Sequence, residues 1–223
     1  DITDPTLRWF AGSDDRANLT FDVYLGDPND EVWFMDTDLS DAAFSFWGED
    51  ADDQSGQAVS SVGDVNGDGY DDFIIGARYD DDGGSQAGQT YLILGKFTGW
   101  SMDTDLAAAA ASFIGEDATD ISGFVVSGAG DVNGDGYDDF IIGVKGDDDG
   151  GNNAGQTYLI LGKASGWSMD TDLSDAAASF IGEDDAESGR DVSGAGDVNG
   201  DGYDDFLIGA PYDDDGGNRA GQT

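Results

Sequence analysis

The chain has 223 residues and carries 49 Asp and Glu against 8 Lys and Arg, with no His and no Cys, so its formal net charge is −41 at pH 7. Nucleic acids and anionic membrane surfaces bind through clustered Lys and Arg, so this composition excludes both as partners. The absence of His and Cys excludes a Cys or His nucleophile and a zinc site of the Cys/His type. No apolar run approaches the roughly 20 residues that membrane insertion requires.

A high net charge is typical of disordered chains, but a hydrophobic content of 38% and an aromatic content of 11% predict a folded protein. The acids are biased, because 44 are Asp and only five are Glu. Asp is the short acid of tight turns and cation loops, so the bias favours bound cations. Because the chain begins with Asp1 and not with Met, we expect a processed or truncated start.

The first segment differs in pattern from the rest of the chain. Residues 5–9 and 19–26 read as two short strands around a Gly-Ser-Asp-Asp turn, and they resemble consecutive strands of bacterial fibronectin-type-III or cadherin-like surface modules. The alternative is that residues 21–26 are a degenerate copy of a strand that recurs at 91–95. We therefore expect residues 1–32 to be either the tail of a β-sandwich-like module or degenerate strands of the repeat that follows.

From residue 33 onward the chain repeats itself. The segment Gly-Asp-Val-Asn-Gly-Asp-Gly-Tyr-Asp-Asp-Phe occurs three times, with its first Asp at positions 64, 131 and 197. A fixed period indicates one structural unit that is copied and stacked against itself. We place the units at approximately residues 33–98, 99–165 and 166–223.

Each unit predicts four short strands. Over one period these are residues 58–62, 73–77, 91–94 and 111–114, which are short apolar runs rich in β-forming residues and bounded by Gly and Asp. The runs do not alternate with polar residues, so we expect both faces of each sheet to be covered. The pattern predicts an all-β fold of β-propeller blades with four antiparallel strands each, about three of them in this chain. The Ala-rich stretch at 106–111 leaves a helical turn as an alternative there.

The loop between the first two strands places oxygen atoms at regular spacing. Counted from Asp64, side-chain oxygens fall at positions 1, 3, 5 and 9, a main-chain carbonyl falls at position 7, and Gly69 allows the sharp turn after position 5. Such a set indicates a hard cation, and three carboxylates would repel one another without it. The predicted Ca²⁺ ligands are Asp64, Asn66, Asp68, Tyr70 and Asp72; Asp131, Asn133, Asp135, Tyr137 and Asp139; and Asp197, Asn199, Asp201, Tyr203 and Asp205.

The loop is not an EF-hand. Its position 12 is Ile75, Ile142 or Ile208 in place of the bidentate Glu, and a strand follows where an EF-hand has a helix. The alternative interpretation is an acidic hairpin turn that binds no metal. Three copies at one period favour about three calcium ions.

Together with Gly209-Ala210-Pro211, and with Phe-Ile-Gly at 113–115 and 180–182, this loop resembles the FG-GAP repeat of integrin-alpha-type β-propellers over roughly residues 33–223. The resemblance implies a calcium ion in the hairpin between the first two strands of each blade. Propellers of that family usually close with about seven blades, so the resemblance implies that these blades are part of a larger propeller or assembly.

Two further features recur with the repeat. The Asp-Asp-Asp-Gly-Gly runs at 80–84, 147–151 and 213–217 are interpreted as solvated acidic loops, with a second set of cation sites as the alternative. The recurring Trp33, Trp100 and Trp167 favour packing in or between blades over a platform for a carbohydrate ligand.

These features predict a non-enzymatic, calcium-binding module that is extracellular or on the cell surface and serves adhesion or assembly. The alternative is an accessory domain of a secreted hydrolase or lyase. The third unit leaves an unpaired strand edge, which predicts a protein partner or self-association into a filament. In that case strands near 21–25 and 44–47 of a neighbouring chain would complete the blade, unless further sequence of the native chain does so.

Overall fold

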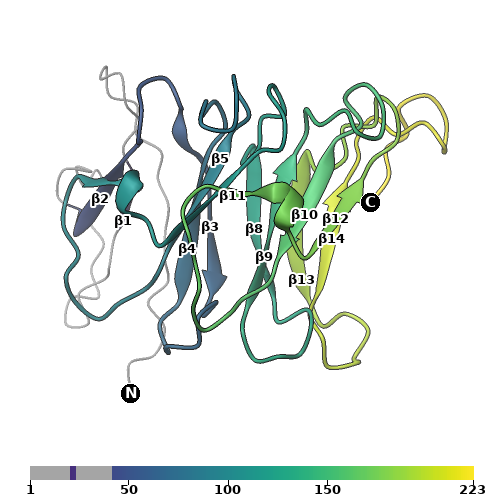
Figure 1. Cartoon of the computed structure of the whole chain (residues 1–223). Coiled ribbons are helices and arrows are strands. Elements are labelled where there is room, and N and C mark those ends of the chain that lie inside the picture. Colours follow the sequence, from purple (N-terminus) through teal and green to yellow (C-terminus); the bar gives the residue numbers. More distant parts are fainter. Residues whose placement is uncertain (1–20, 24–41) are drawn as a thin grey trace, which may run out of the picture.

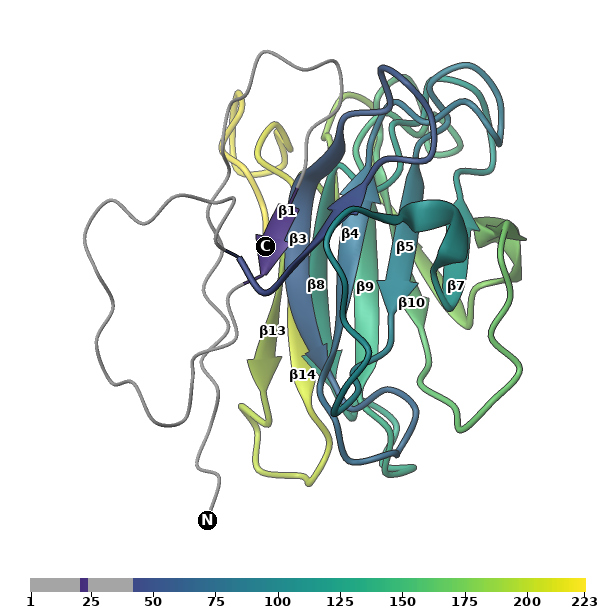
Figure 2. The same cartoon turned by 90° about the vertical axis from the view of Figure 1, so that its left-hand side faces the viewer.

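The computed structural model describes residues 42–223 and the backbone of residues 21–23. This part of the chain is all-β, with two short 3-10 turns and no α-helix. The sheets stand side by side, and in the three blades defined below the first strand of each blade lies next to the first strand of the neighbouring blade (Figure 1, Figure 2). This is the predicted arrangement of stacked blades. None of the helical turns in the described residues is long and apolar enough to cross a membrane.

The blades are antiparallel sheets in which consecutive strands pair, in the predicted four-strand order. Blade one consists of β3 (Ser55–Gly63), β4 (Asp72–Ala77), β5 (Gln89–Ile93) and β7 (Ala111–Ile114). Blade two consists of β8 (Val125–Gly130), β9 (Asp139–Val144), β10 (Gln156–Ile160) and β12 (Ala178–Ile181). Blade three contributes β13 (Asp191–Gly196) and β14 (Asp205–Gly209).

The middle strands are buried on both faces, which explains their continuous apolar runs. Every residue of β4 and of β9 is buried. Ile74 belongs to a core shared with Val126 of blade two, whereas the adjacent Ile75 belongs to a core shared with Phe44 on the other side of the sheet. Successive side chains of a strand point to opposite faces, so each face of the sheet packs against a different neighbour.

The stretch before each outer strand contains a 3-10 turn, so the helical alternative is correct for part of the Ala-rich segment. The turn spans Leu106–Ala108 in the first copy, and the Asp105 carboxylate caps it by accepting the N–H of Ala107 at 2.9 Å. The strand then begins at Ala111, as predicted. The second copy repeats the turn at Leu173–Asp175. The short strands β6 (Thr104–Asp105) and β11 (Thr171–Asp172) pair in parallel with β2 (Phe44–Trp47) and β7, the outer strands of the preceding sheets.

Two strands precede blade one. In β1 (Phe21–Val23) and β2 (Phe44–Trp47) the Cα partner of residue 22 is Ser45. The third and fourth strands of blade one have the same register, because Tyr91 pairs with Ser112. The backbone of residues 21–23 therefore lies relative to β2 as a third blade strand does. The remaining residues before Ala42 lie outside the described part of the chain, so the division at residue 32 stays a prediction.

The recurring Trp residues pack between blades, as the sequence analysis favoured. Trp100 stacks on Phe44, with ring centroids 4.3 Å apart, and Trp167 stacks on Phe140 at 6.4 Å. The amino groups of Lys96 and Lys163 lie 4.6 Å from the centroids of Trp100 and Trp167. These rings are thus already engaged by Phe and Lys side chains. Trp33 lies outside the described residues.

Neighbouring blades approach one another at glycines. A Cβ on Gly76 would lie 2.2 Å from the carbonyl oxygen of Gly123, and a Cβ on Gly143 would lie 2.2 Å from that of Gly189. No side chain fits in such a contact, because real Cβ atoms do not approach a backbone oxygen so closely. The Gly of Ile-Ile-Gly in the first two repeats therefore allows the second strand of one blade to touch the backbone of the next.

We expect Gly143→Ala to destabilise the protein by about 2–3 kcal/mol, the usual cost of overpacking a well-packed interior. Gly209→Ala is the matched control at the same position of repeat three, where the nearest atom to a Cβ is 3.4 Å away. Urea unfolding measures both free energies. Equal losses for the two variants would contradict the close approach between blades.

Candidate metal centres

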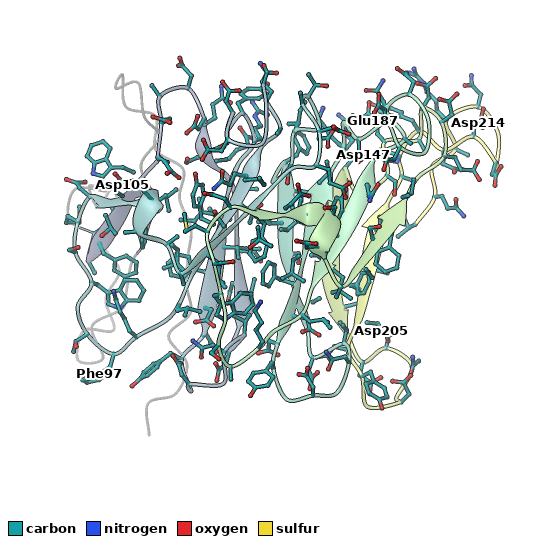
Figure 3. All side chains as sticks on the ribbon, viewed as in Figure 1. Phe97, Asp105, Asp147, Glu187, Asp205 and Asp214 are labelled. Atoms are coloured by element: carbon teal, nitrogen blue, oxygen red, sulfur yellow. The ribbon has the colours of Figure 1, made fainter. Side chains whose placement is uncertain are left out.

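The three predicted cation loops lie at one end of the blades. They connect β3 to β4, β8 to β9, and β13 to β14. Asp205, labelled in Figure 3, marks this end of blade three, whereas Asp147 and Asp214 lie at the opposite end. We call the three loops at this end the cation loops. We call the loops at the other end, which include residues 80–84, 147–151 and 213–217, the opposite loops.

The first cation loop is organised by its own carboxylates. One oxygen of Asp64 accepts the N–H groups of Gly67 and Asp68 at 2.7 and 3.0 Å, and the other accepts the N–H of Gly69 at 2.8 Å. The Asn66 amide oxygen accepts the N–H of Asp68 at 2.8 Å. Gly67 and Gly69 have φ values of +74° and +89°, a region that favours glycine. The spacing of Asp, Asn and Gly is therefore what folds the loop around its first residue.

Asp72 lies at the base of this loop and is buried. Its two oxygens accept the N–H of Val65 at 3.0 Å and the N–H of Gly95 at 2.6 Å. Burial nevertheless raises the pKa of Asp72 to about 7, and the charges of Asp68 and Asp64 add to the shift. The site therefore holds negative charge that its hydrogen bonds do not fully compensate.

The other two cation loops repeat this geometry. Asp131 and Asp197 accept the N–H groups of Gly134 and Gly200, each at 2.7 Å. Burial raises the pKa of Asp139, the counterpart of Asp72, to about 6. In blade three the loop is exposed, and hydrogen bonds, led by the N–H of Gly202, lower the pKa of Asp197.

The oxygen donors of the cation loops suit a hard cation, but they do not surround a common point as a closed cage. Among the described residues, no group of three or more Asp or Glu side chains is placed to hold a metal ion. Asp64, Asn66 and Asp68 do share one network, because the Asn66 amide donates to Asp68 at 3.0 Å. The oxygens of Asp72 instead face the N–H groups of Val65 and Gly95. All predicted donors are oxygens, which is the ligand type that Ca²⁺ takes.

The opposite loops contain buried acids that the sequence analysis interpreted as solvated. The first Asp of each Asp-Asp-Asp-Gly-Gly run is buried, with Asp80, Asp147 and Asp213 at most 5% exposed. Each accepts the N–H of the residue two positions ahead, for example Asp82 to Asp80 at 2.9 Å. Only the later residues of each run face solvent. The sequence offers one signal for this contact, because an Asp at the start of a turn often accepts the backbone N–H of the residue two positions ahead.

A tyrosine joins this second acidic group. The Tyr91 hydroxyl lies 3.0 Å from both Asp80 and Glu49, although it has only one proton to donate. Burial raises the pKa of Asp80, and of its counterpart Asp147 in blade two, to about 6. Burial also raises the pKa of Asp53 in blade one and, to about 7, that of its counterpart Asp120 in blade two. Ala186 is buried at the equivalent position of blade three. The opposite loops therefore hold carboxyl groups that bind protons close to neutral pH.

We expect the free energy of unfolding in the presence of a chelator to fall as pH rises from about 4 to about 7.5. The folded state binds the Asp120 proton more tightly than the unfolded chain does, so stability is lost as pH rises through the folded-state pKa of about 7. Asp120→Asn should remove on the order of 2 kcal/mol of this dependence, since one pKa unit is worth about 1.4 kcal/mol before screening. Urea unfolding at pH 5 and pH 7.5 measures it, with the exposed Asp148→Asn as control. Relative to the unmodified chain, Asp120→Asn should lose more stability at pH 5 than at pH 7.5; an equal or smaller loss at pH 5 would contradict the assignment.

Comparison with known proteins bears on the whole repeat region. The family model for the FG-GAP repeat matches residues 55–93, 122–160 and 188–223, about half of the chain. Each matched segment begins at a Ser-Gly pair, so the Phe-Ile-Gly segments at 113–115 and 180–182 lie outside the matched residues.

The relatives are integrin chains. The protein is similar to integrin alpha-V of Gallus gallus, with 29% identity over 157 residues that cover 68% of this chain. It is also similar to integrin alpha pat-2 of Caenorhabditis briggsae and of Caenorhabditis elegans, with 33% and 32% identity over 158 residues and 67% of this chain. The chain spans 13% of the length of each of these curated relatives. With three matched repeats folded as successive blades, this chain belongs to the FG-GAP repeat family of integrin-type β-propellers.

Proposed function

We propose that this chain is a calcium-binding, non-catalytic module that serves adhesion or assembly outside the cell or at its surface. Membership of the FG-GAP family and similarity to integrin alpha chains support an adhesion-type role with a protein partner. Extracellular calcium is abundant enough to fill weak sites, which fits an extracellular location.

The observation that carries the proposal is the identical construction of three all-oxygen loops. In each, the first Asp gathers the N–H groups of the loop and the third and fifth positions add side-chain oxygens to the same network. We assign the ion of blade one to Asp64, Asn66, Asp68, the Tyr70 carbonyl and Asp72. The ions of blades two and three are assigned to the residues at equivalent positions, Asp131 to Asp139 and Asp197 to Asp205. Burial raises the pKa of Asp72, and a cation there would offset the charges of Asp68 and Asp64 that add to this shift.

We expect isothermal titration to find about three calcium sites per chain, with dissociation constants of about 10⁻⁵–10⁻³ M. Asp68→Ala should remove one of these sites. A chelator should lower the melting temperature, because an ion that binds only the folded state adds about 2.7 kcal/mol per site to the free energy of unfolding at a hundredfold excess over Kd.

The control for this experiment is Asp148→Ala, which removes one exposed negative charge from an opposite loop. It should leave the number of calcium sites unchanged. An unmodified chain that binds no calcium, or that prefers a transition metal, would refute the assignment.

The alternative of an accessory domain in a secreted hydrolase or lyase requires the same cation loops. It differs in placing a catalytic domain in the same polypeptide, and the comparisons with integrin chains favour adhesion over it.

Self-association is a second proposal, and the exposed face of blade three supports it. Val198 and Leu207 are 70% and 50% exposed, although their counterparts in blade one, Val65 and Ile74, are fully buried against blade two. On β14 the edge away from β13 carries only the bridge between Ala210 and Gln222 within the described residues. Blade three thus presents the surface by which blades one and two receive the next blade.

The occupant that we propose is a second copy of this chain, because blade one carries the complementary half. In blade two Tyr137 packs against Gly67 of the preceding loop, and in blade three Tyr203 packs against Gly134. The corresponding Tyr70 of blade one is 43% exposed, and no atom lies within 4 Å of a Cβ on Gly200. A repeated contact of this kind joins different surfaces, so it builds a ring or a filament.

We expect sedimentation velocity with calcium present to show association that grows with protein concentration. Leu207→Glu on one face and Tyr70→Ala on the other should each weaken it, because each removes one side of the same contact. Asp148→Ala, at an exposed residue in the opposite loop of blade two, is the control and should not. A chain that remains monomeric at every concentration would exclude this contact.

A further inference from the structure

The cation loops of neighbouring blades are joined by direct hydrogen bonds. The carboxylate of Asp138 in the second loop accepts the N–H of Asp64, the first residue of the first loop, at 2.8 Å. The N–H of Asp138 donates back to the carbonyl of Asp64 at 3.3 Å. One residue of blade two therefore clamps the backbone at which the loop of blade one begins.

Blades two and three repeat the clamp. The carboxylate of Asp204 accepts the N–H of Asp131 at 3.0 Å, and the N–H of Asp204 donates to the carbonyl of Asp131 at 3.1 Å. The glycine before each clamped Asp makes room for the carboxylate. A Cβ on Gly63 would lie 2.0 Å from an oxygen of Asp138, and one on Gly130 would lie 2.1 Å from an oxygen of Asp204.

The clamped residue is the one on which its loop depends. Asp64 accepts three backbone N–H groups of its own loop and is the first of the proposed calcium ligands. The adjacent Tyr137 packs against Gly67 of the same loop, so blade two holds the first loop at two points. Neither the Tyr137 ring nor the Asp138 carboxylate is itself a proposed ligand.

The third loop is not clamped in this way. Within the described residues no hydrogen bond to the N–H of Asp197 is present, and no atom lies within 4 Å of a Cβ on Gly196 or on Gly200. In blade one, Asp71 holds the position of Asp138 but is exposed, and in the described part of the chain its carboxylate makes no hydrogen bond to another cation loop. Residues 42–223 therefore contain two clamped loops, one unclamped loop, and one residue at the clamp position, Asp71, that clamps none of these three loops.

We propose that Asp138 and Asp204 are positioning residues for the calcium site of the preceding blade, and that neighbouring sites are coupled through them. Calcium at the second loop orders the segment that contains Tyr137 and Asp138, and this segment in turn holds Asp64 in its binding position. A loop whose first residue is already held loses less conformational freedom when the ion binds, so its affinity is higher. The inference rests on the proposed calcium function of the loops.

The test follows the backbone amide NMR signals of Gly69, Gly136 and Gly202, one in each loop, during calcium titration of the full chain. In the unmodified protein the first two loops should bind more tightly than the third. Asp138→Ala should weaken binding at the first loop about tenfold, which is about 1.4 kcal/mol, and leave the third loop unchanged. Asp204→Ala should do the same to the second loop.

Three controls separate positioning from charge and from general destabilisation. At protein concentrations where the chain is monomeric, Asp71→Ala removes the same charge at the same loop position and should change no affinity. Asp138→Asn keeps a side-chain oxygen that can accept the Asp64 N–H, so it should restore most of the affinity. Thermal melting in excess calcium checks that each variant is folded. The comparison of the third loop with the first two is made in the unmodified protein, so it does not depend on the folding of any variant.

The outcomes distinguish the two proposals. If no loop binds calcium, the proposed function and the coupling both fail. If all loops bind but Asp138→Ala and Asp71→Ala have equal effects, or the third loop binds as tightly as the others, calcium binding stands and the coupling is wrong.

Discussion

The close approach of neighbouring blades, backbone against backbone, is the constraint on which this structure depends. A single sheet with apolar side chains on both faces cannot exist alone in water, because each face must be covered. Ile74 and Ile75 are both fully buried only because different neighbours cover the two sides of β4. Glycines such as Gly143 set the distance between blades to that of a direct backbone contact. At that distance the loops at both ends come within reach of hydrogen bonds.

The same packing determines which groups contact the charged side chains in a chain of net charge −41. All six Lys and Arg side chains in residues 42–223 lie over aromatic rings, at 4.6–5.2 Å from a ring centroid. In this part of the chain one ion pair is formed, between Arg190 and Glu187. The buried carboxylates are held by backbone N–H groups and by tyrosine instead, as at Asp72 and Asp80. Hydrogen bonds from neutral donors leave the net charge in place, so protons or bound cations must balance it.

The sequence predicts much of the fold, because the repeat shows the same local signals three times. The apolar runs at 73–77 and 91–94 coincide with β4 and β5, and the glycines of the cation loop occupy backbone conformations that other residues rarely adopt. What could not be predicted depends on distance between blades. Asp138 is one acid among many in the sequence, and only the docking of blade two places it on Asp64. The burial of Asp80 was missed because the turn signal shows only that its carboxylate accepts a backbone N–H two residues on, and it gives no sign that the same carboxylate packs against Tyr91.

The amino-acid sequence of the repeats varies less at one end of the blades than at the other. The nine residues from Asp64 to Asp72 recur without change from Asp131 and from Asp197. At the opposite end the buried Asp53 and Asp120 of blades one and two are replaced by Ala186 in blade three. Asp53 and Asp120 each accept one backbone N–H, from the exposed Asp50 and Asp117, so their exchange for Ala leaves a single donor that water can reach. A loop in which Asp64, Asn66 and Asp68 each hold the backbone offers no such exchange, since every change leaves N–H groups without an acceptor. The repeats are therefore identical at the end that carries the cation loops, because there each of these residues is needed both to fold the loop and to bind the proposed ion.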